Sequence, residues 1–232
     1  MNNNEQIKKL TKKDYEQFKN VLYVFKEAPW YENLTEEDVK SEWQLYEKSK
    51  IEKALEKNII EPNDFYSVLG YFVDDQLVSM ISYTLSYGND PMHIEHGVDF
   101  KQEDIISYIF GMATLSSARG YGYNTKLLKQ LVEYFKQINI NKSYARYAVN
   151  KDEIKYVNNN YEEIIKGYSK YPSKSESINI LKKCGYIEYF KNPYDLHIQN
   201  LSDAEYKFNH DEDLRAFVVL DCDKEKVKKI KA

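Results

Sequence analysis

The feature that most constrains the fold of this chain is a strand-like segment that runs into a helical one through two closely spaced glycines. An apolar run at 107–115 has strand character, and Arg119-Gly120-Tyr121-Gly122 follows it. A strand, a glycine turn and a long helix in this order predict an α/β fold. The helix is indicated by apolar side chains at three- and four-residue intervals, namely Leu127, Leu128, Leu131, Val132, Phe135 and Ile138.

The rest of the chain supplies the other elements of a mixed sheet and its helices. Thr11 with Asp14 three residues later predicts the start of one helix, and Thr35 with acidic residues after it predicts a second. Two β-rich runs at 65–87 flank Asp74-Asp75-Gln76 and predict a hairpin. We also expect strands at 7–10, 142–149 and 215–222, a helix at 152–168, and a helix, glycine and strand within 173–190.

Composition narrows the class of protein. The chain has 232 residues and a formal net charge of -4, and no Pro/Gly/Ser-rich linker divides it, so we expect one domain over residues 1–232. Mild acidity disfavours nucleic acid as a partner, because phosphate binding needs a clustered basic surface. Two cysteines do not make a disulfide framework, and no apolar run has the length of a membrane span. These features predict a soluble cytoplasmic protein that binds neither nucleic acid nor a membrane.

The turn itself can bind an anion. The first N–H groups of a helix have no partner within the helix, and the macrodipole makes this end positive. Gly120 and Gly122 permit close approach of a ligand to the backbone, while Arg119 and the Thr125 hydroxyl could add contacts. The stretch lacks the Gly-Lys-Ser/Thr ending of a P-loop and the third glycine of a dinucleotide fingerprint. An ordinary structural turn is the competing interpretation.

The stretch resembles motif A of the GCN5-related N-acetyltransferase (GNAT) family, Gln/Arg-x-x-Gly-x-Gly/Ala between a central strand and a long helix. Arg119, Gly120 and Gly122 match it, as do Thr125 and the leucine pair after it, whereas Ser117 and Asn124 depart from it. The similarity of element order covers residues from about 5 to 190, with extra segments at about 88–104, 151–172 and 191–213. The resemblance implies a mostly antiparallel central sheet flanked by helices and a backbone cradle for the pyrophosphate of acetyl-coenzyme A. The implied cofactor-binding residues are Met112, Ala113, Thr114, Ser117, Arg119, Gly120, Tyr121, Gly122, Tyr123, Asn124 and Thr125.

In this family the acetyl group passes from the thioester to an amine, and the resemblance implies the same here. A backbone N–H within 112–114 would then contact the thioester carbonyl. Glu95 and His96, just before the cofactor strand, are candidates for the proton acceptor, and side chains of a solvated loop are the alternative. Many members carry a tyrosine proton donor four residues before the later glycine, where this chain has Leu181. Tyr186 and Tyr189 are candidate substitutes, and packing in the core is the alternative for both.

The acceptor is expected to be a small-molecule amine or a peptide, and no metal is expected. Glu27, Trp30, Tyr31 and Glu32, with the acidic residues of 88–104, favour a cationic amine, although acidic loops are commonly just solvated. A homodimer is left open. The alternative function is a catalytically silent module of the same fold, which binds acyl-coenzyme A as a sensor or partner protein, and Leu181 is the feature that favours it.

Overall fold

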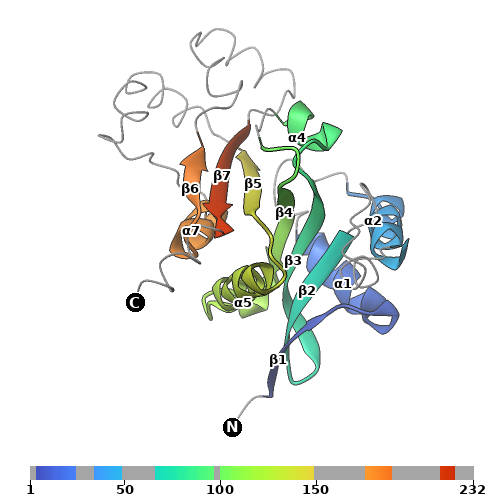
Figure 1. Ribbon diagram of the computed structural model, residues 1–232. Coiled ribbons are helices and arrows are strands. Elements are labelled where there is room, and N and C mark those ends of the chain that lie inside the picture. Colours follow the sequence, from blue (N-terminus) through green and yellow to red (C-terminus); the bar gives the residue numbers. More distant parts are fainter. Residues whose placement is uncertain are drawn as a thin grey trace, which may run out of the picture.

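The computed structural model describes residues 4–24, 34–48, 66–96, 100–148, 176–189 and 215–222. Within these ranges seven strands form one sheet in the order β1-β2-β3-β4-β5-β7-β6 (Figure 1). The strands are β1 (Glu5–Lys9), β2 (Tyr66–Val73), β3 (Gln76–Tyr87), β4 (Ile105–Thr114), β5 (Lys142–Ala148), β6 (Ile187–Tyr189) and β7 (Arg215–Asp221). The helices are α1 (Tyr15–Leu22), α2 (Glu36–Lys48), α4 (Pro91–Glu95), α5 (Tyr123–Gln137) and α7 (Glu176–Lys183), with 3-10 turns η1 (Lys12–Asp14) and η4 (Ser116–Ala118).

The two central strands of the sheet, β4 and β5, diverge after a short parallel pairing. β4 and β5 pair in parallel only from Ile106 opposite Lys142 to Ile109 opposite Ala145. Beyond that point β5 continues along β7 as far as Ala148, while β4 continues along β3 as far as Thr114. The remaining pairs in the sheet are antiparallel. No described strand therefore pairs with the edge of β4 that follows Ile109.

A β-bulge marks the same place on the other side of β4. Ser82 of β3 lies opposite Gly111 and Tyr83 lies opposite Ile109, so Phe110 is the extra residue. A bulge bends its strand and increases the local twist. The bend and the parting of β5 coincide, so that one edge of β4 has no partner among the described strands while the other edge stays paired with β3.

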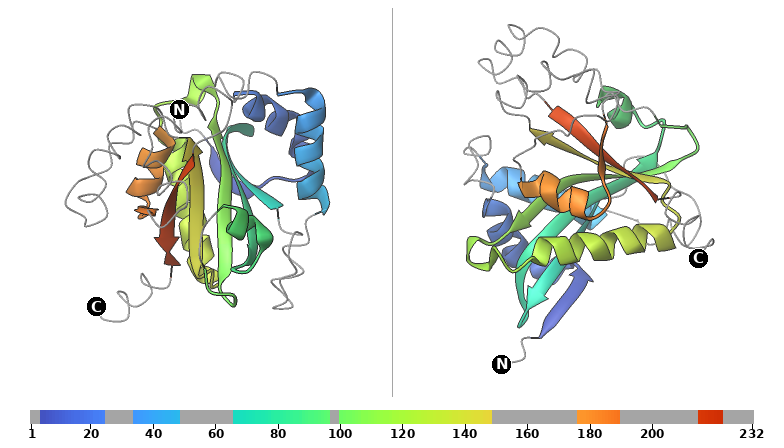
Figure 2. Two further views of the ribbon diagram at one scale, coloured as in Figure 1. Left: turned by 90° about the horizontal axis from the view of Figure 1, so that it is seen from above. Right: turned by 90° about the vertical axis from the view of Figure 1, so that its left-hand side faces the viewer.

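Two hydrophobic cores hold helices against the two faces of the sheet. On one face, Leu127, Leu131 and Phe135 of α5 pack with the sheet, together with Ile178 and Leu181 of α7. On the other face, a second core joins α1 and α2 to β2, β3 and β4. The view from above in Figure 2 shows α1 and α2 on one side of the sheet and α7 on the other. The second core contains Phe18, Val21, Leu22, Val39, Trp43, Val68, Phe72, Leu77, Met80 and Ala113.

Most local predictions are confirmed. Thr11 and Asp14 form a reciprocal capping box, and Thr35 and Asp38 bond each other in the same way before α2. The hairpin turn has φ of 49° at Asp74 and 64° at Asp75, the left-handed pair that a tight two-residue turn requires. The mixed, mostly antiparallel sheet flanked by helices is also confirmed. The helix expected at 152–168 lies outside the described residues, and the single domain over 1–232 stays a prediction.

The segment 88–104 differs from the acidic surface loop that its composition indicates. It contains the short helix α4, and Asp90, His93 and Asp104 are buried. Asp90 Oδ1 accepts the N–H of Met92 at 2.9 Å, and Asp104 Oδ2 lies 3.9 Å from Nζ of Lys142. These two carboxylates therefore serve the fold, because each has a partner within the protein.

Candidate functional site

The turn between β4 and α5 has the backbone geometry of an anion cradle. Gly120 has φ of +86° and Gly122 has φ of +74°, and Gly122 is the left-handed N-cap residue of α5. Among the residues that the structure describes, no side chain caps this helix end. A Cβ placed on either glycine would meet no heavy atom within 4 Å, so the space in front of the turn is open. The first-turn N–H groups and the positive helix end thus face an accessible space that suits a phosphate or pyrophosphate group.

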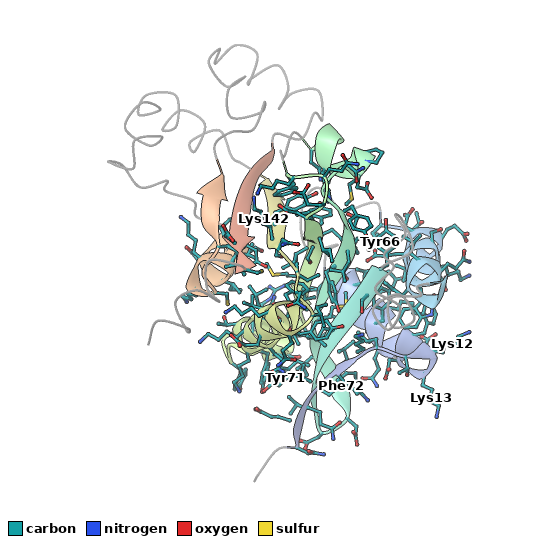
Figure 3. The ribbon with its side chains drawn as sticks, in the orientation of Figure 1. Lys12, Lys13, Tyr66, Tyr71, Phe72 and Lys142 are labelled. Carbon is teal, nitrogen blue, oxygen red and sulfur yellow. The ribbon has the colours of Figure 1, made fainter. Side chains whose placement is uncertain are left out.

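The side chains of the turn separate into exposed and buried groups. Ser117, Arg119 and Tyr121 are exposed. Tyr123 is buried, and its ring lies between those of Tyr71, with centroids 4.7 Å apart, and Tyr121, at 5.6 Å. Figure 3 shows Tyr71 beside α5. The buried Tyr123 anchors the first turn of the helix to the sheet, while Ser117 and Arg119 stay accessible to a ligand.

Asn124 and Thr125 are partly buried in the first turn of α5. The Asn124 side-chain oxygen is buried and has no hydrogen-bond partner among the described residues. A buried polar atom without a partner costs free energy, so a ligand or water at this position would stabilise it. Because this oxygen is a hydrogen-bond acceptor, it needs a donor and does not itself add to the binding of an anion at the turn.

The residues predicted for the thioester contact lie on the part of β4 that has no β5 partner. Met112, Ala113 and Thr114 pair with β3 only. The Ala113 carbonyl accepts a hydrogen bond from the Ser79 hydroxyl at 3.1 Å, and the Ser79 and Thr114 hydroxyl oxygens lie 2.9 Å apart. The three predicted residues are therefore held by β3 from one side, with the other side of the strand turned toward the gap that β5 leaves.

A histidine and tyrosine cluster occupies the point where β4 and β5 part. The Tyr144 hydroxyl lies 2.9 Å from Nδ1 of both His93 and His96, and Nε2 of His93 lies 2.8 Å from the Ser86 hydroxyl. Because a tyrosine hydroxyl has one hydrogen, Tyr144 donates to at most one of these nitrogens and accepts an N–H from the other. Burial lowers the pKa of His93 from 6.5 to about 4, so His93 is neutral at pH 7.

Of the two candidate proton acceptors, His96 belongs to this cluster, because its Nδ1 contacts the Tyr144 hydroxyl. Its ring packs against Tyr108, which stacks on Tyr144 one pair before the last parallel pair of β4 and β5. Glu95 is the last residue of α4, and its side chain is outside the described part of the structure. His96 thus lies next to the opening in the sheet, and its role as a base stays a prediction.

Tyr186, the candidate proton donor, lies on the opposite face. Its side chain is 2% exposed and belongs to the core beneath α5 and α7, and its hydroxyl donates to Ser143 Oγ at 2.7 Å. Burial raises the pKa of the Tyr186 hydroxyl. Successive side chains of a strand point to opposite faces, so Ser143 and Tyr144 face away from each other. The structure therefore does not bring Tyr186 and His96 together, and nothing in this placement supports a proton-donor role for Tyr186.

One carboxylate that sequence patterns did not single out lies close to the bulge. The Tyr46 hydroxyl donates to Glu42 Oε1 at 2.6 Å and contacts Ser82 Oγ at 3.2 Å. Ser82 is the residue opposite Gly111 at the bulge of β4. The only signal in the sequence was the spacing, because Glu42 precedes Tyr46 by four residues and hence shares its face of α2.

Two general properties of the described residues bear on the site. Among them, no three His, Cys, Asp or Glu side chains are grouped closely enough to hold a metal ion. The helices that the structure describes include none long and apolar enough to cross a bilayer.

Comparison with known proteins assigns the chain to a family. The model of the acetyltransferase (GNAT) family matches residues 25–157. The chain is similar in structure to the ribosomal-protein-alanine N-acetyltransferase of Brucella melitensis, with 16% identity, a TM-score of 0.53, and coverage of 93% of this chain and 99% of that one. It is also similar to PH1933 of Pyrococcus horikoshii, with 12% identity, a TM-score of 0.51, and coverage of 94% and 98%. No curated protein matches the sequence significantly. Since the family model covers more than half of its residues, the chain belongs to the GNAT acetyltransferase family.

Proposed function

We propose that the protein is an N-acetyltransferase, which transfers the acetyl group of acetyl-coenzyme A to a primary amine of a small cationic molecule or a peptide. A cytoplasmic location belongs to the same proposal. The main support is the N-terminus of α5, which no described side chain caps. Two glycines of positive φ open the backbone there, directly after a strand edge that pairs with no described strand. Phosphates bind at such helix ends because the free N–H groups and the macrodipole both favour negative charge.

Different residues would bind the pyrophosphate and the thioester of the cofactor. The amides of the turn and the exposed Arg119 would hold the pyrophosphate, and Arg119 compensates in part for Ser117, which stands where the family has Gln or Arg. A backbone N–H of β4 within 112–114 would stabilise charge that develops on the carbonyl oxygen, since that side of β4 is not used by β5. Acetyl-coenzyme A supplies the activated acetyl group as a thioester.

The proposal is tested by two measurements on the full chain. Thermal melts with acetyl-coenzyme A should give a melting temperature that rises with ligand concentration, because the ligand binds the folded state. Release of free thiol should then be followed across a panel of primary amines: spermidine, tyramine, an aminoglycoside and a short peptide with a free N-terminus. Amine-dependent thiol release supports the proposal. No melting shift at saturating acetyl-coenzyme A would reject it.

A second function, an acyl-coenzyme A sensor without turnover, is favoured by one observation. Leu181 replaces the tyrosine that many members use as a proton donor, and Tyr186, the nearest substitute, is engaged with Ser143 in the core. A sensor would show the same melting shift with acetyl-coenzyme A and no thiol release with any amine. The thiol assay therefore decides between the two functions.

A further inference from the structure

Glu42 is a carboxylate held against the sheet at the bulge of the cofactor strand. It lies on the face of α2 that packs on the sheet, one turn before Tyr46, and both side chains are partly buried. The Tyr46 hydroxyl touches Glu42 and Ser82 at once, and Ser82 is paired with Gly111. Glu42 is thus linked to β4 through two residues: it bonds Tyr46, Tyr46 contacts Ser82, and Ser82 pairs with β4 near the point where β5 diverges.

The surroundings of Glu42 are aromatic rather than basic. The Tyr46 ring contacts the Tyr66 ring with centroids 6.4 Å apart, and Tyr66 contacts Phe110, the bulged residue, at 5.7 Å. Figure 3 shows Tyr66 on the side of the sheet toward α2. Among the described residues no Lys, Arg or His forms an ion pair with Glu42. Burial raises the pKa of the Glu42 carboxyl, partly opposed by the Tyr46 hydrogen bond.

A partly buried carboxylate with no cationic partner among the described residues, near aromatic residues that are themselves partly exposed, is suited to a positive ligand. Burying a carboxylate is costly unless a partner compensates it, and an ammonium group does so by charge and hydrogen bonds. Aromatic rings attract the same group through their negative faces. The hydrogen bond from Tyr46 to Oε1 restrains the direction of the carboxylate, and a carboxylate can accept further hydrogen bonds from an ammonium group.

We infer that Glu42 binds the ammonium group of the acceptor beside Tyr66 and Phe110 and takes its proton before acetyl transfer. This inference rests on the proposed function and adds to it the residue that recognises and activates the amine. It places the amine on the α2 side of the sheet, whereas the phosphate cradle begins at α5, which packs on the other face. The two substrates would then meet from opposite faces at the gap between β4 and β5.

With Glu42 as the base, the acetyl transfer proceeds as follows. The ammonium gives one proton to the carboxylate, and the freed lone pair of the nitrogen attacks the thioester carbonyl carbon. The carbon–sulfur bond breaks as the amide forms, and the second nitrogen proton passes to the departing sulfur, which leaves as the thiol. Glu42 then releases its proton to water. A carboxyl with a raised pKa suits this role, because a base works best when its pKa is nearer the working pH.

The test compares Glu42→Gln with Glu37→Gln. The first change keeps an oxygen that can accept the Tyr46 hydrogen bond but removes the charge, and the second removes an exposed carboxylate from the same helix. Three quantities are measured: the melting shift with acetyl-coenzyme A, the additional shift when spermidine or tyramine is added with coenzyme A, and thiol release with the best amine of the panel. General-base catalysis contributes about 10²–10⁴-fold, which sets the expected loss of kcat/KM for Glu42→Gln.

The expected result is an unchanged acetyl-coenzyme A shift, loss of the amine-dependent shift and at least about a 100-fold lower kcat/KM in Glu42→Gln, with Glu37→Gln like the wild type. If Glu42→Gln transfers acetyl groups as well as the wild type, the inference is overturned and the proposed function stands. If the wild type binds acetyl-coenzyme A without releasing thiol, an amine-dependent shift that Glu42→Gln abolishes supports the amine site, and its absence overturns it. If the wild type does not bind acetyl-coenzyme A, the proposed function fails and this inference fails with it.

Discussion

Replacing Gly122 by leucine separates the cradle from an ordinary turn. Gly122 has φ of +74°, and a Cβ there meets no heavy atom of the described residues within 4 Å, so the change introduces backbone strain without a clash at the Cβ position. A left-handed conformation costs a residue other than glycine about 1–2 kcal/mol. For a domain of this size, about 1 kcal/mol corresponds to about 2–4 °C, so the ligand-free variant should melt about 2–8 °C below the wild type. The added side chain, however, fills the space that a phosphate would occupy.

The decisive quantity is the stabilisation of this variant by acetyl-coenzyme A. Wild-type protein with acetyl-coenzyme A at about 100 times Kd gains about 2.7 kcal/mol, whereas a variant with about 100-fold weaker binding gains only RT ln 2, about 0.4 kcal/mol, at the same concentration. Gly185→Ala is the matched control, since Gly185 has φ of +96° at the end of α7, and this change should lower stability without affecting the ligand shift. A full acetyl-coenzyme A shift in Gly122→Leu would refute the cradle.

Three further changes test other parts of the molecule. His93→Gln should make the free energy of unfolding less dependent on pH on the acid side. The pKa of His93 is about 4 in the folded protein and 6.5 in the unfolded one, so below pH 6.5 the unfolded state binds more protons. In urea titrations the wild type should lose about 2 kcal/mol of stability between pH 7 and pH 5, and the variant should not. Tyr186→Phe should lower stability by about 1 kcal/mol through loss of the bond to Ser143 and leave acetyl transfer nearly unchanged. A loss of kcat of about 100-fold would instead support Tyr186 as the proton donor. Thr35→Ala should cost about 1 kcal/mol in a denaturant titration, because the Asp38 N–H loses its cap; an unchanged stability would contradict that reading of the helix start.

The features that sequence patterns predicted are local ones. The capping residues before α1 and α2, the two-aspartate turn of the hairpin and the stripe of α5 each depend on residues within a few positions of one another. The positive φ at Gly120 and Gly122 was likewise predictable, since a strand must turn into a helix there within a few residues. These local rules were sufficient for the α/β class and for the backbone geometry of the turn, while the binding of a phosphate there stays a prediction.

The features that the sequence did not reveal depend on contacts between distant segments. Glu42 reads as one of several acidic positions on α2, and only the packing of α2 on β3 brings it to Ser82. Tyr186 follows the later glycine as expected, but the pairing of β6 with β7 and the core under α7 decide that its hydroxyl is buried. His93 has a polar sequence context, and its burial depends on Tyr144, which is 51 residues away. Sequence spacing carries no signal for these distant partners.

In the proposed function, backbone amides of the turn before α5 hold the pyrophosphate of acetyl-coenzyme A. The most direct measurement is a titration of ¹⁵N-labelled protein with acetyl-coenzyme A, in which the backbone amide signals are followed by NMR. We expect large, saturable shifts of the amide signals of Gly120, Gly122 and Asn124, with little change for the amides of β1, such as Ile7. Unchanged signals from the turn at ligand concentrations that stabilise the protein would contradict it.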